Sequence, residues 1–298
     1  MQQFAHFYQA GKKTAAALAV GLLGASLLHS TAVASSLSEI QEKGEIRIAV
    51  ANEIPYGFID PSGEAKGAGP EVAKHIAKQL GIDKIEWVST NFGSLIPGLQ
   101  ADRFDMVAAE MAILPQRCKQ VIYSEPNSSY GEGLLVPAGN PNDLHSYDVF
   151  ADGDYTVAIM AGADQLEMLQ ALGVDESKML TISNNADAIS TVSTGRADAY
   201  AATGLTAAEL AKRSEQVELA AEFVDPVIND ETIRSWGGFT FAQGSESLRD
   251  AVNEALAEFK QTQEWADILS HYGFSDLDQS ESNTRTTAEL CAVTDGPF

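Results

Sequence analysis

The fold is decided by one stretch of sequence, which begins with the alternating segment Glu45-Ile46-Arg47-Ile48-Ala49-Val50. Its apolar end predicts a β-strand that enters a hydrophobic core. Residues 70–81 start with proline, end with glycine and carry apolar residues at helical spacing, which predicts a helix. Further strands are expected at residues 85–88 and 106–109, with a helix at residues 92–101 between them. Strands that alternate with helices indicate a largely parallel sheet in an α/β fold.

The same alternation restarts after Asn140-Pro141. We expect strands at residues 156–159, 179–182, 197–201 and 236–241, and helices at residues 165–172, 185–194, 248–262 and 265–272. Two such units with a returning C-terminal segment predict two lobes. Residues 35–135 and 236–298 would form the first lobe, and residues 136–235 the second. Hinge segments are expected near residues 134–139 and 231–235.

The N-terminal residues have the layout of a cleavable secretory signal. Lys12-Lys13 precede an apolar run over residues 14–28, and Ala32-Val33-Ala34 follow it. This pattern predicts a signal peptide over residues 1–34 and an exported mature chain, which the family resemblance described below would place in the periplasm. A retained anchor is the alternative, although the run is shorter than the roughly 20 residues of a membrane-spanning helix. The net charge of -23 repels phosphate backbones, so no nucleic-acid partner is expected.

Several short motifs occur in a characteristic order along the chain. They are Asp102-Arg103-Phe104-Asp105-Met106-Val107, Leu114-Pro115-Gln116-Arg117, Gly195-Arg196-Ala197-Asp198-Ala199 and Trp265-Ala266-Asp267-Ile268-Leu269-Ser270-His271-Tyr272-Gly273. Together they resemble the family 3 extracellular solute-binding proteins of ABC importers. The resemblance implies a type II periplasmic binding protein fold, a ligand cleft between two lobes that close about a hinge, a monomer, and permease subunits in the inner membrane as partners.

Within that family, three segments look most like the ectoine and hydroxyectoine binding subunits. They are Asn52-Glu53-Ile54-Pro55-Tyr56-Gly57-Phe58, Asn91-Phe92-Gly93-Ser94-Leu95-Ile96-Pro97 and Arg117-Cys118. The resemblance implies that this chain binds ectoine or hydroxyectoine. A polar amino acid, or another compatible solute, is the alternative ligand.

Arg117 is the candidate anchor for the ligand's carboxylate, because its fork of donors can form two parallel hydrogen bonds and the family uses the matching arginine in this way. A surface salt bridge is the alternative role. Glu53, Tyr56, Phe58 and Phe92 are the candidates for the cationic end, where a carboxylate and aromatic faces would surround a delocalised cation. The alternatives are core or turn positions for the aromatic residues and a solvated loop position for Glu53.

The second lobe offers the backbone amides of Ala163, Asp164 and Gln165, which could close on the anionic end of the ligand. Asp164 could instead be only the N-cap of the helix that follows. Amino acid binders of the family usually meet the ligand's ammonium with Thr or Ser near positions 112 and 114 and with Asp near position 203. This chain has Ala112, Leu114 and Thr203 there. Thr203 is therefore a candidate ligand contact in a modified site.

The two cysteines, Cys118 and Cys291, permit one disulfide in an exported protein, and two separate thiols are the alternative. The histidines show no metal-ligand spacing, so neither a metal nor another cofactor is expected. We expect no catalysis. The enzymatic alternative is a periplasmic prephenate or arogenate dehydratase, in which Glu53 or Glu110 would serve as the acid.

Overall fold

Two separate β-sheets organise the chain, whose computed structural model describes residues 36–292. The predicted signal peptide at residues 1–34 lies outside the described residues. The first sheet has the order β4 (Lys84–Ser89), β1 (Glu45–Val50), β5 (Met106–Ala112), β15 (Ser235–Ala242) and β6 (Val121–Tyr123), with β7 (Ser128–Tyr130) also paired to β15. Strands β4, β1 and β5 are parallel, and β15 is antiparallel to its neighbours. The expected parallel α/β arrangement is therefore present.

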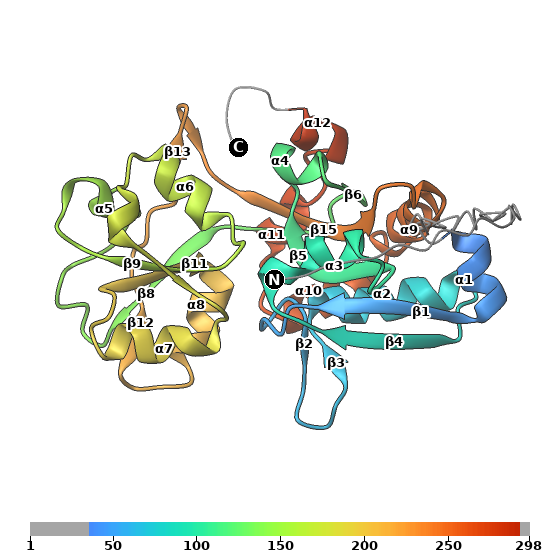
Figure 1. Ribbon diagram of the computed structural model, residues 1–298, viewed down its shortest axis with the longest axis horizontal. Helices are drawn as coiled ribbons and strands as arrows, with labels where there is room; N and C mark the ends of the chain where they lie inside the picture. The colour runs from blue at the N-terminus through green and yellow to red at the C-terminus, as the bar shows by residue number, and fades with distance from the viewer. Residues whose placement is uncertain (1–35, 293–298) are drawn as a thin grey trace, which may run out of the picture. The chain divides into compact units, whose positions relative to one another are not determined.

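Helices from both ends of the chain accompany this first sheet (Figure 1). They are α1 (Leu37–Lys43), α2 (Ala68–Gln79), the 3-10 turn η1 (Phe92–Ser94) with α3 (Leu95–Gln100), α4 (Pro115–Cys118), α9 (Glu246–Phe259), α10 (Gln263–His271), α11 (Asp276–Glu281) and α12 (Thr287–Cys291). Helix α2 buries Val72, Ala73 and Ile76, whereas Leu80, the last residue of the predicted apolar face, is half-buried at the C-cap. This apolar face packs on β5, α9 and α10.

The second sheet has the order β10 (Met179–Ile182), β9 (Val157–Met160), β11 (Ala199–Thr203), β8 (Glu132–Pro137) and β12 (Val217–Leu219). Strands β10, β9 and β11 are parallel, and β8 runs antiparallel to β11 and β12. Its helices are α5 (Val149–Asp152), α6 (Gln165–Ala171), α7 (Ala186–Ser193) and α8 (Gly204–Ala211), with the 3-10 turn η2 (Glu176–Lys178) before β10. Lobe 1 denotes the elements of the first sheet, and lobe 2 those of the second.

The chain crosses between the sheets at two places. It leaves lobe 1 between β7 and β8 at Gly131, and it returns when β15 begins at Ser235. The first crossing lies upstream of the expected hinge at residues 134–139, because most of those residues already belong to the buried strand β8. Asp225 joins the two crossings, since its Oδ1 accepts a hydrogen bond of 2.8 Å from the Glu132 backbone N–H.

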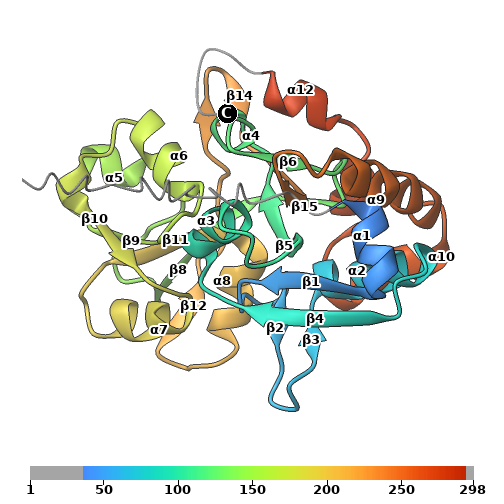
Figure 2. The ribbon, with the colours of Figure 1, turned by 45° about the vertical axis from the view of Figure 1, so that its right-hand side comes forward.

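Two hairpins form separate two-stranded sheets. Strands β2 (Phe58–Ile59) and β3 (Ala65–Lys66) form one, which projects beside β4 in both views (Figures 1 and 2). Strands β13 (Val227–Ile228) and β14 (Glu231–Thr232) form the other, on the path back to lobe 1. Among residues 36–292, none of the helices has the length and apolar character needed to cross a membrane.

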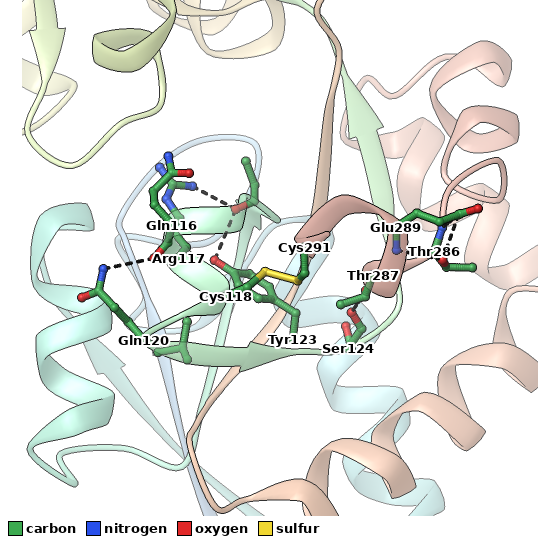
Figure 3. Close-up of a disulfide and its surroundings, with 12 residues drawn as sticks. Gln116, Arg117, Cys118, Gln120, Tyr123, Ser124, Thr286, Thr287, Glu289 and Cys291 are labelled. Carbon is green, nitrogen blue, oxygen red and sulfur yellow. Dashed lines mark hydrogen bonds between the residues drawn. A yellow bond between two sulfur atoms is a disulfide. The ribbon is translucent and has the colours of Figure 1, made fainter. Parts of the chain in front are cut away.

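A disulfide links Cys118 at the end of α4 to Cys291 at the end of α12, across a sequence separation of 173 residues (Figure 3). Beside it, the Thr287 hydroxyl donates to the backbone oxygen of Ser124 at 2.5 Å. Helix α12 is capped by Thr286, whose side chain accepts from the backbone N–H of Glu289. The C-terminal helix is therefore held against the short helix that carries Arg117.

Candidate functional site

A small cavity lies where residues of both lobes meet. Its volume is about 20 Å³, enough for about one water molecule. It is lined by Glu53, Tyr56, Phe92, Ala109, Glu110, Tyr130, Met160, Ala163, Asp164, Gln165, Tyr200, Ala202 and Thr203. Many of these residues follow or end a parallel strand, which is the edge where α/β sheets bind ligands. The cavity in this arrangement is therefore too small for an organic solute.

Most of the predicted site residues line this cavity. The structure brings together Glu53, Tyr56 and Phe92 from lobe 1 with Ala163, Asp164, Gln165 and Thr203 from lobe 2. Two other candidates, Phe58 and Arg117, are not among the lining residues. Contact of any of these residues with a ligand remains a prediction.

Phe58 lies on the β2–β3 hairpin, outside the cavity wall. It is half-buried and pairs with Lys66 across the hairpin. Phe92 is only 8% exposed and packs into the hydrophobic core while one side faces the cavity. The two aromatic residues therefore differ in position, because one leaves the sheet on a projecting hairpin and the other starts the turn before α3.

Arg117 is buried directly beside the cavity and spans the two lobes. Its Nη1 donates to the backbone oxygen of Ala112 at 3.0 Å, and its Nη2 donates to that of Gly162 at 2.9 Å. Its Cζ lies 5.7 Å from the centre of the Phe92 ring. Burial opposes the charge, but Asp164 and other nearby groups outweigh it and raise the pKa of Arg117.

The Arg117 guanidinium has five N–H donors, so its two main-chain bonds leave donors for a ligand. The alternative of a surface salt bridge is wrong, since Arg117 is 5% exposed.

Three carboxylates line the cavity, and all are buried. The Thr206 hydroxyl donates to Glu53 at 2.8 Å, and the Ser235 hydroxyl donates to Asp164 at 3.1 Å. Burial raises the pKa of Glu53, which is 7% exposed, so its alternative as a solvated loop acid is wrong. Asp164 makes no side-chain cap of α6, because its carboxylate points across to the start of β15 instead.

Glu110 is the third carboxylate, and it lies within β5 in an unusual conformation. Its φ of 48° lies in the left-handed region, where residues other than glycine are uncommon. Asn127 and Ser128 donate to its two carboxylate oxygens, and the Tyr130 hydroxyl donates to its backbone oxygen. Burial raises the pKa of Glu110. The residue therefore faces the interior of lobe 1 and borders the cavity, rather than capping an exposed strand edge.

The sequence interpretation missed two lining tyrosines and one acid behind the wall. Tyr130 lies with its ring centre 5.1 Å from that of Tyr56, and Tyr200 donates to Asn185. Tyr200 lies inside the predicted strand at residues 197–201, so strand alternation could have indicated its direction. Glu132 follows the lobe crossing, and no motif marked it.

Direct hydrogen bonds join the lobes across the cavity. The Tyr56 hydroxyl of lobe 1 donates to Thr203 Oγ1 of lobe 2 at 2.7 Å. The bond from Thr206 to Glu53 and the bond from Arg117 to Gly162 also cross between the lobes. The structure is therefore a closed arrangement. Within residues 36–292, no cluster of His, Cys, Asp and Glu side chains could hold a metal ion.

Residues 46–275 match the family model described as bacterial extracellular solute-binding proteins, family 3. The chain belongs to this family. It is 54% identical over 291 residues to the probable amino-acid ABC transporter periplasmic-binding protein y4tE of Sinorhizobium fredii, which covers 97% of this chain and 95% of that protein. This family 3 protein is thus a solute-binding subunit of an amino-acid-type ABC importer, which works with inner-membrane permease subunits.

Two solved structures extend the comparison. EhuB in complex with hydroxyectoine has a TM-score of 0.77 and 31% identity, over 87% of this chain and 98% of EhuB. AncCDT-1 is described as an ancestral amino acid-binding protein and a precursor of cyclohexadienyl dehydratase. It has a TM-score of 0.69 and 29% identity, over 80% of this chain and 99% of AncCDT-1. A second structure of AncCDT-1 is described as a cationic amino acid solute-binding protein. These likenesses place the family 3 protein in the type II periplasmic binding protein fold, and the proteins compared are solute-binding proteins.

Proposed function

We propose that this protein is the periplasmic binding subunit for ectoine or hydroxyectoine, exported with its signal peptide and closing about the two lobe crossings. Ectoine carries a carboxylate and a cyclic amidinium with a delocalised charge. Such a ligand needs one cationic anchor, together with carboxylates and aromatic faces. The observation that carries the proposal is the buried Arg117, stacked beside Phe92, next to a cavity lined by Glu53, Asp164 and aromatic rings.

Three further observations support this choice. Phe92, Tyr56, Tyr130 and Tyr200 all border the cavity, and a cation over an aromatic face gains about 0.5 to 2 kcal/mol. EhuB, which was solved with hydroxyectoine, shares the fold over most of its length. The usual ammonium contacts of amino acid binders would need Thr or Ser near Ala112 and Leu114, which this chain does not provide.

The test is isothermal titration calorimetry of the purified mature protein. The panel contains ectoine, hydroxyectoine, glycine betaine, arginine, glutamine and cystine. We expect ectoine or hydroxyectoine to bind with micromolar or tighter affinity and the others far more weakly. Tight binding of an amino acid with no response to either ectoine would contradict the ligand while leaving the family untouched.

Phe92→Ala tests the aromatic contact with the solute. We expect it to weaken ectoine binding strongly, whereas Phe150→Ala, a core substitution in lobe 2 that is remote from the cavity lining, should leave the affinity of the folded protein unchanged. Both substitutions delete a buried ring, which costs about 3–5 kcal/mol of stability. Melting curves of both variants therefore show how much of each protein is folded at the temperature of the titration. Unchanged ectoine affinity in folded Phe92→Ala protein would reduce Phe92 to a packing role.

A cationic amino acid is the second candidate ligand. Three buried carboxylates border the cavity, none of the lining residues in the described part of the chain is an arginine or lysine, and Arg117 lies beside the cavity. This surplus of negative charge suits a ligand with an additional cation. The likeness to AncCDT-1 supports the same class. Arginine in the calorimetry panel separates the two candidates.

A further inference from the structure

Glu132 is a buried acid directly behind the cavity wall, and neither the sequence motifs nor the family resemblance gives it a role. It is the first residue of β8, immediately after the lobe crossing, and is 6% exposed. It pairs with Thr203 in the register of β8 and β11. Its Oε2 accepts a hydrogen bond of 2.6 Å from Gln165 Nε2. Glu132 thus contacts two residues that line the cavity.

The second oxygen of Glu132 has no partner. Its Oε1 is buried and forms no hydrogen bond in the structure. In residues 36–292, the ion pairs between basic and acidic side chains do not include Glu132. A buried carboxylate without a cation and with a free oxygen is costly when it is ionised.

The hydroxyl of Tyr147 supplies a second, independent observation. It lies 3.0 Å from Glu132 Oε2 and 3.1 Å from the backbone oxygens of both Gly133 and Ala202. A hydroxyl carries one proton, and the two carbonyl oxygens can only accept. One proton therefore serves three acceptors if Glu132 is ionised. A protonated Glu132 lessens this conflict, because its own O–H can donate to the Tyr147 oxygen and the Tyr147 proton is then shared by only the two backbone oxygens.

The charged groups that face Glu132 also favour the protonated form of its carboxyl group. Asp164 approaches from the N-terminus of α6, and Asp225 approaches from the segment that precedes β13. Both are carboxylates. Gln165 and Tyr147 lie within hydrogen-bonding distance of Glu132, and Tyr56 is close enough to interact with it electrostatically. Burial first, and then repulsion by Asp164, raise the pKa of Glu132 well above its ordinary value.

We propose that Glu132 is a positioning residue that orients Gln165 and exchanges its own proton for the cationic group of the solute. Because Gln165 Nε2 is committed to Glu132, the amide oxygen of Gln165 is the atom left to accept from a solute N–H. When the cation settles beside Gln165 and Asp164, the Glu132 O–H bond breaks and the proton passes to solvent. The carboxylate that remains then balances the bound cation. This inference takes only one point from the proposed function, namely that the solute carries a cationic group.

The exchange predicts that solute affinity rises with pH. Below the folded pKa of Glu132, the solute has to displace one proton, so Kd should fall about tenfold for each pH unit gained. Calorimetry with ectoine in phosphate and in Tris buffer counts that proton, because the two buffers differ in ionisation enthalpy. We expect wild-type protein to release a proton and E132Q, which keeps an amide able to bond Tyr147 and Gln165, to release none.

A solute-free measurement decides the protonation state independently of the ligand. A raised pKa means that protonation of Glu132 stabilises the folded state, and this stability is lost as pH rises through the folded pKa. E132Q mimics the protonated form. Its free energy of unfolding should therefore match wild type near about pH 4, below the pKa of an unfolded glutamate, and exceed it at about pH 8. E218Q, which removes an acid of β12 outside the cavity lining, should follow wild type.

The two arms fail in different ways. If the unfolding free energies of wild type and E132Q change in parallel with pH, Glu132 holds no exchangeable proton and the inference is overturned, whichever solute binds. If ectoine binds wild-type protein without proton release, the exchange is overturned while the proposed function stands. If ectoine does not bind, the proposed function fails, and the stability measurement still decides the protonation of Glu132.

Discussion

At the scale of single residues, Arg117 connects the lobes by bonds to two main-chain oxygens. Its guanidinium is buried between Ala112 of lobe 1 and Gly162 of lobe 2 and lies over the Phe92 ring. This setting fixes the plane of the fork beside the cavity. A solute carboxylate that reaches the remaining donors would meet a group whose orientation is already set, which reduces the entropy lost on binding.

Arg117→Ala should weaken solute binding by at least roughly 30-fold, because breaking a buried charged pair costs about 2–5 kcal/mol. The measurement is calorimetric titration with the solute that the panel identifies. Arg196→Ala removes the same charge at an exposed position and should leave affinity unchanged. Near-normal affinity in Arg117→Ala, with folding intact, would exclude Arg117 as the carboxylate anchor.

At the scale of elements, the disulfide joins two short helices that could not hold their positions alone. Helix α4 covers Pro115–Cys118 and α12 covers Thr287–Cys291. Helices of this length are marginal without tertiary support. Leu290 is buried in the core cluster, and Thr287 donates to Ser124. The covalent link therefore holds α12 on lobe 1, next to Arg117.

Replacing both cysteines by serine should lower the free energy of unfolding by about 2–5 kcal/mol, because the bridge closes a long loop. Solute affinity should fall only slightly if α4 keeps its place. Denaturant unfolding measures the first quantity and calorimetry the second. Protein from the periplasm that reacts as two free thiols, or a double variant as stable as wild type, would contradict this role.

At the scale of the whole molecule, hydrogen bonds between the lobes favour the closed arrangement even without a solute. The Tyr56–Thr203 and Thr206–Glu53 bonds cross the cavity, and Asp225 ties the first crossing to the return segment. A solute shifts a hinge equilibrium only through its preference for the closed state. The more these hydrogen bonds stabilise the closed state before binding, the less of the solute's binding free energy is needed to close the lobes.

Tyr56→Phe deletes one of these bonds and keeps the aromatic ring. A hydrogen bond contributes about 1 kcal/mol, so the ratio of closed to open protein should fall roughly fivefold. Small-angle X-ray scattering of the solute-free variant should give a larger radius of gyration than wild type. Tyr155→Phe, a half-buried tyrosine outside the cavity lining, is the control. Equal radii for Tyr56→Phe and wild type would show that this bond does not hold the lobes.

The family and most of the longer helices and strands could be predicted from the sequence. Helical spacing in α2 and the apolar strands β1 and β5 follow from which side chains are apolar, a property of neighbouring residues. The same local reasoning overlooked the short strands β6, β7 and β8, whose pairing partners are distant in the chain. Ordered motifs then indicated the two-lobed fold and most residues of the cavity wall.

Only the tertiary structure decided how the charged side chains are used. Asp164 turns from α6 to Ser235, Phe58 is carried off on a hairpin, and Glu132 is buried behind Gln165. None of these contacts could be predicted from the spacing of residues in the sequence. The burial of a charge depends on what the other lobe brings against it, so the partners of an acid can be assigned only when both lobes are in place.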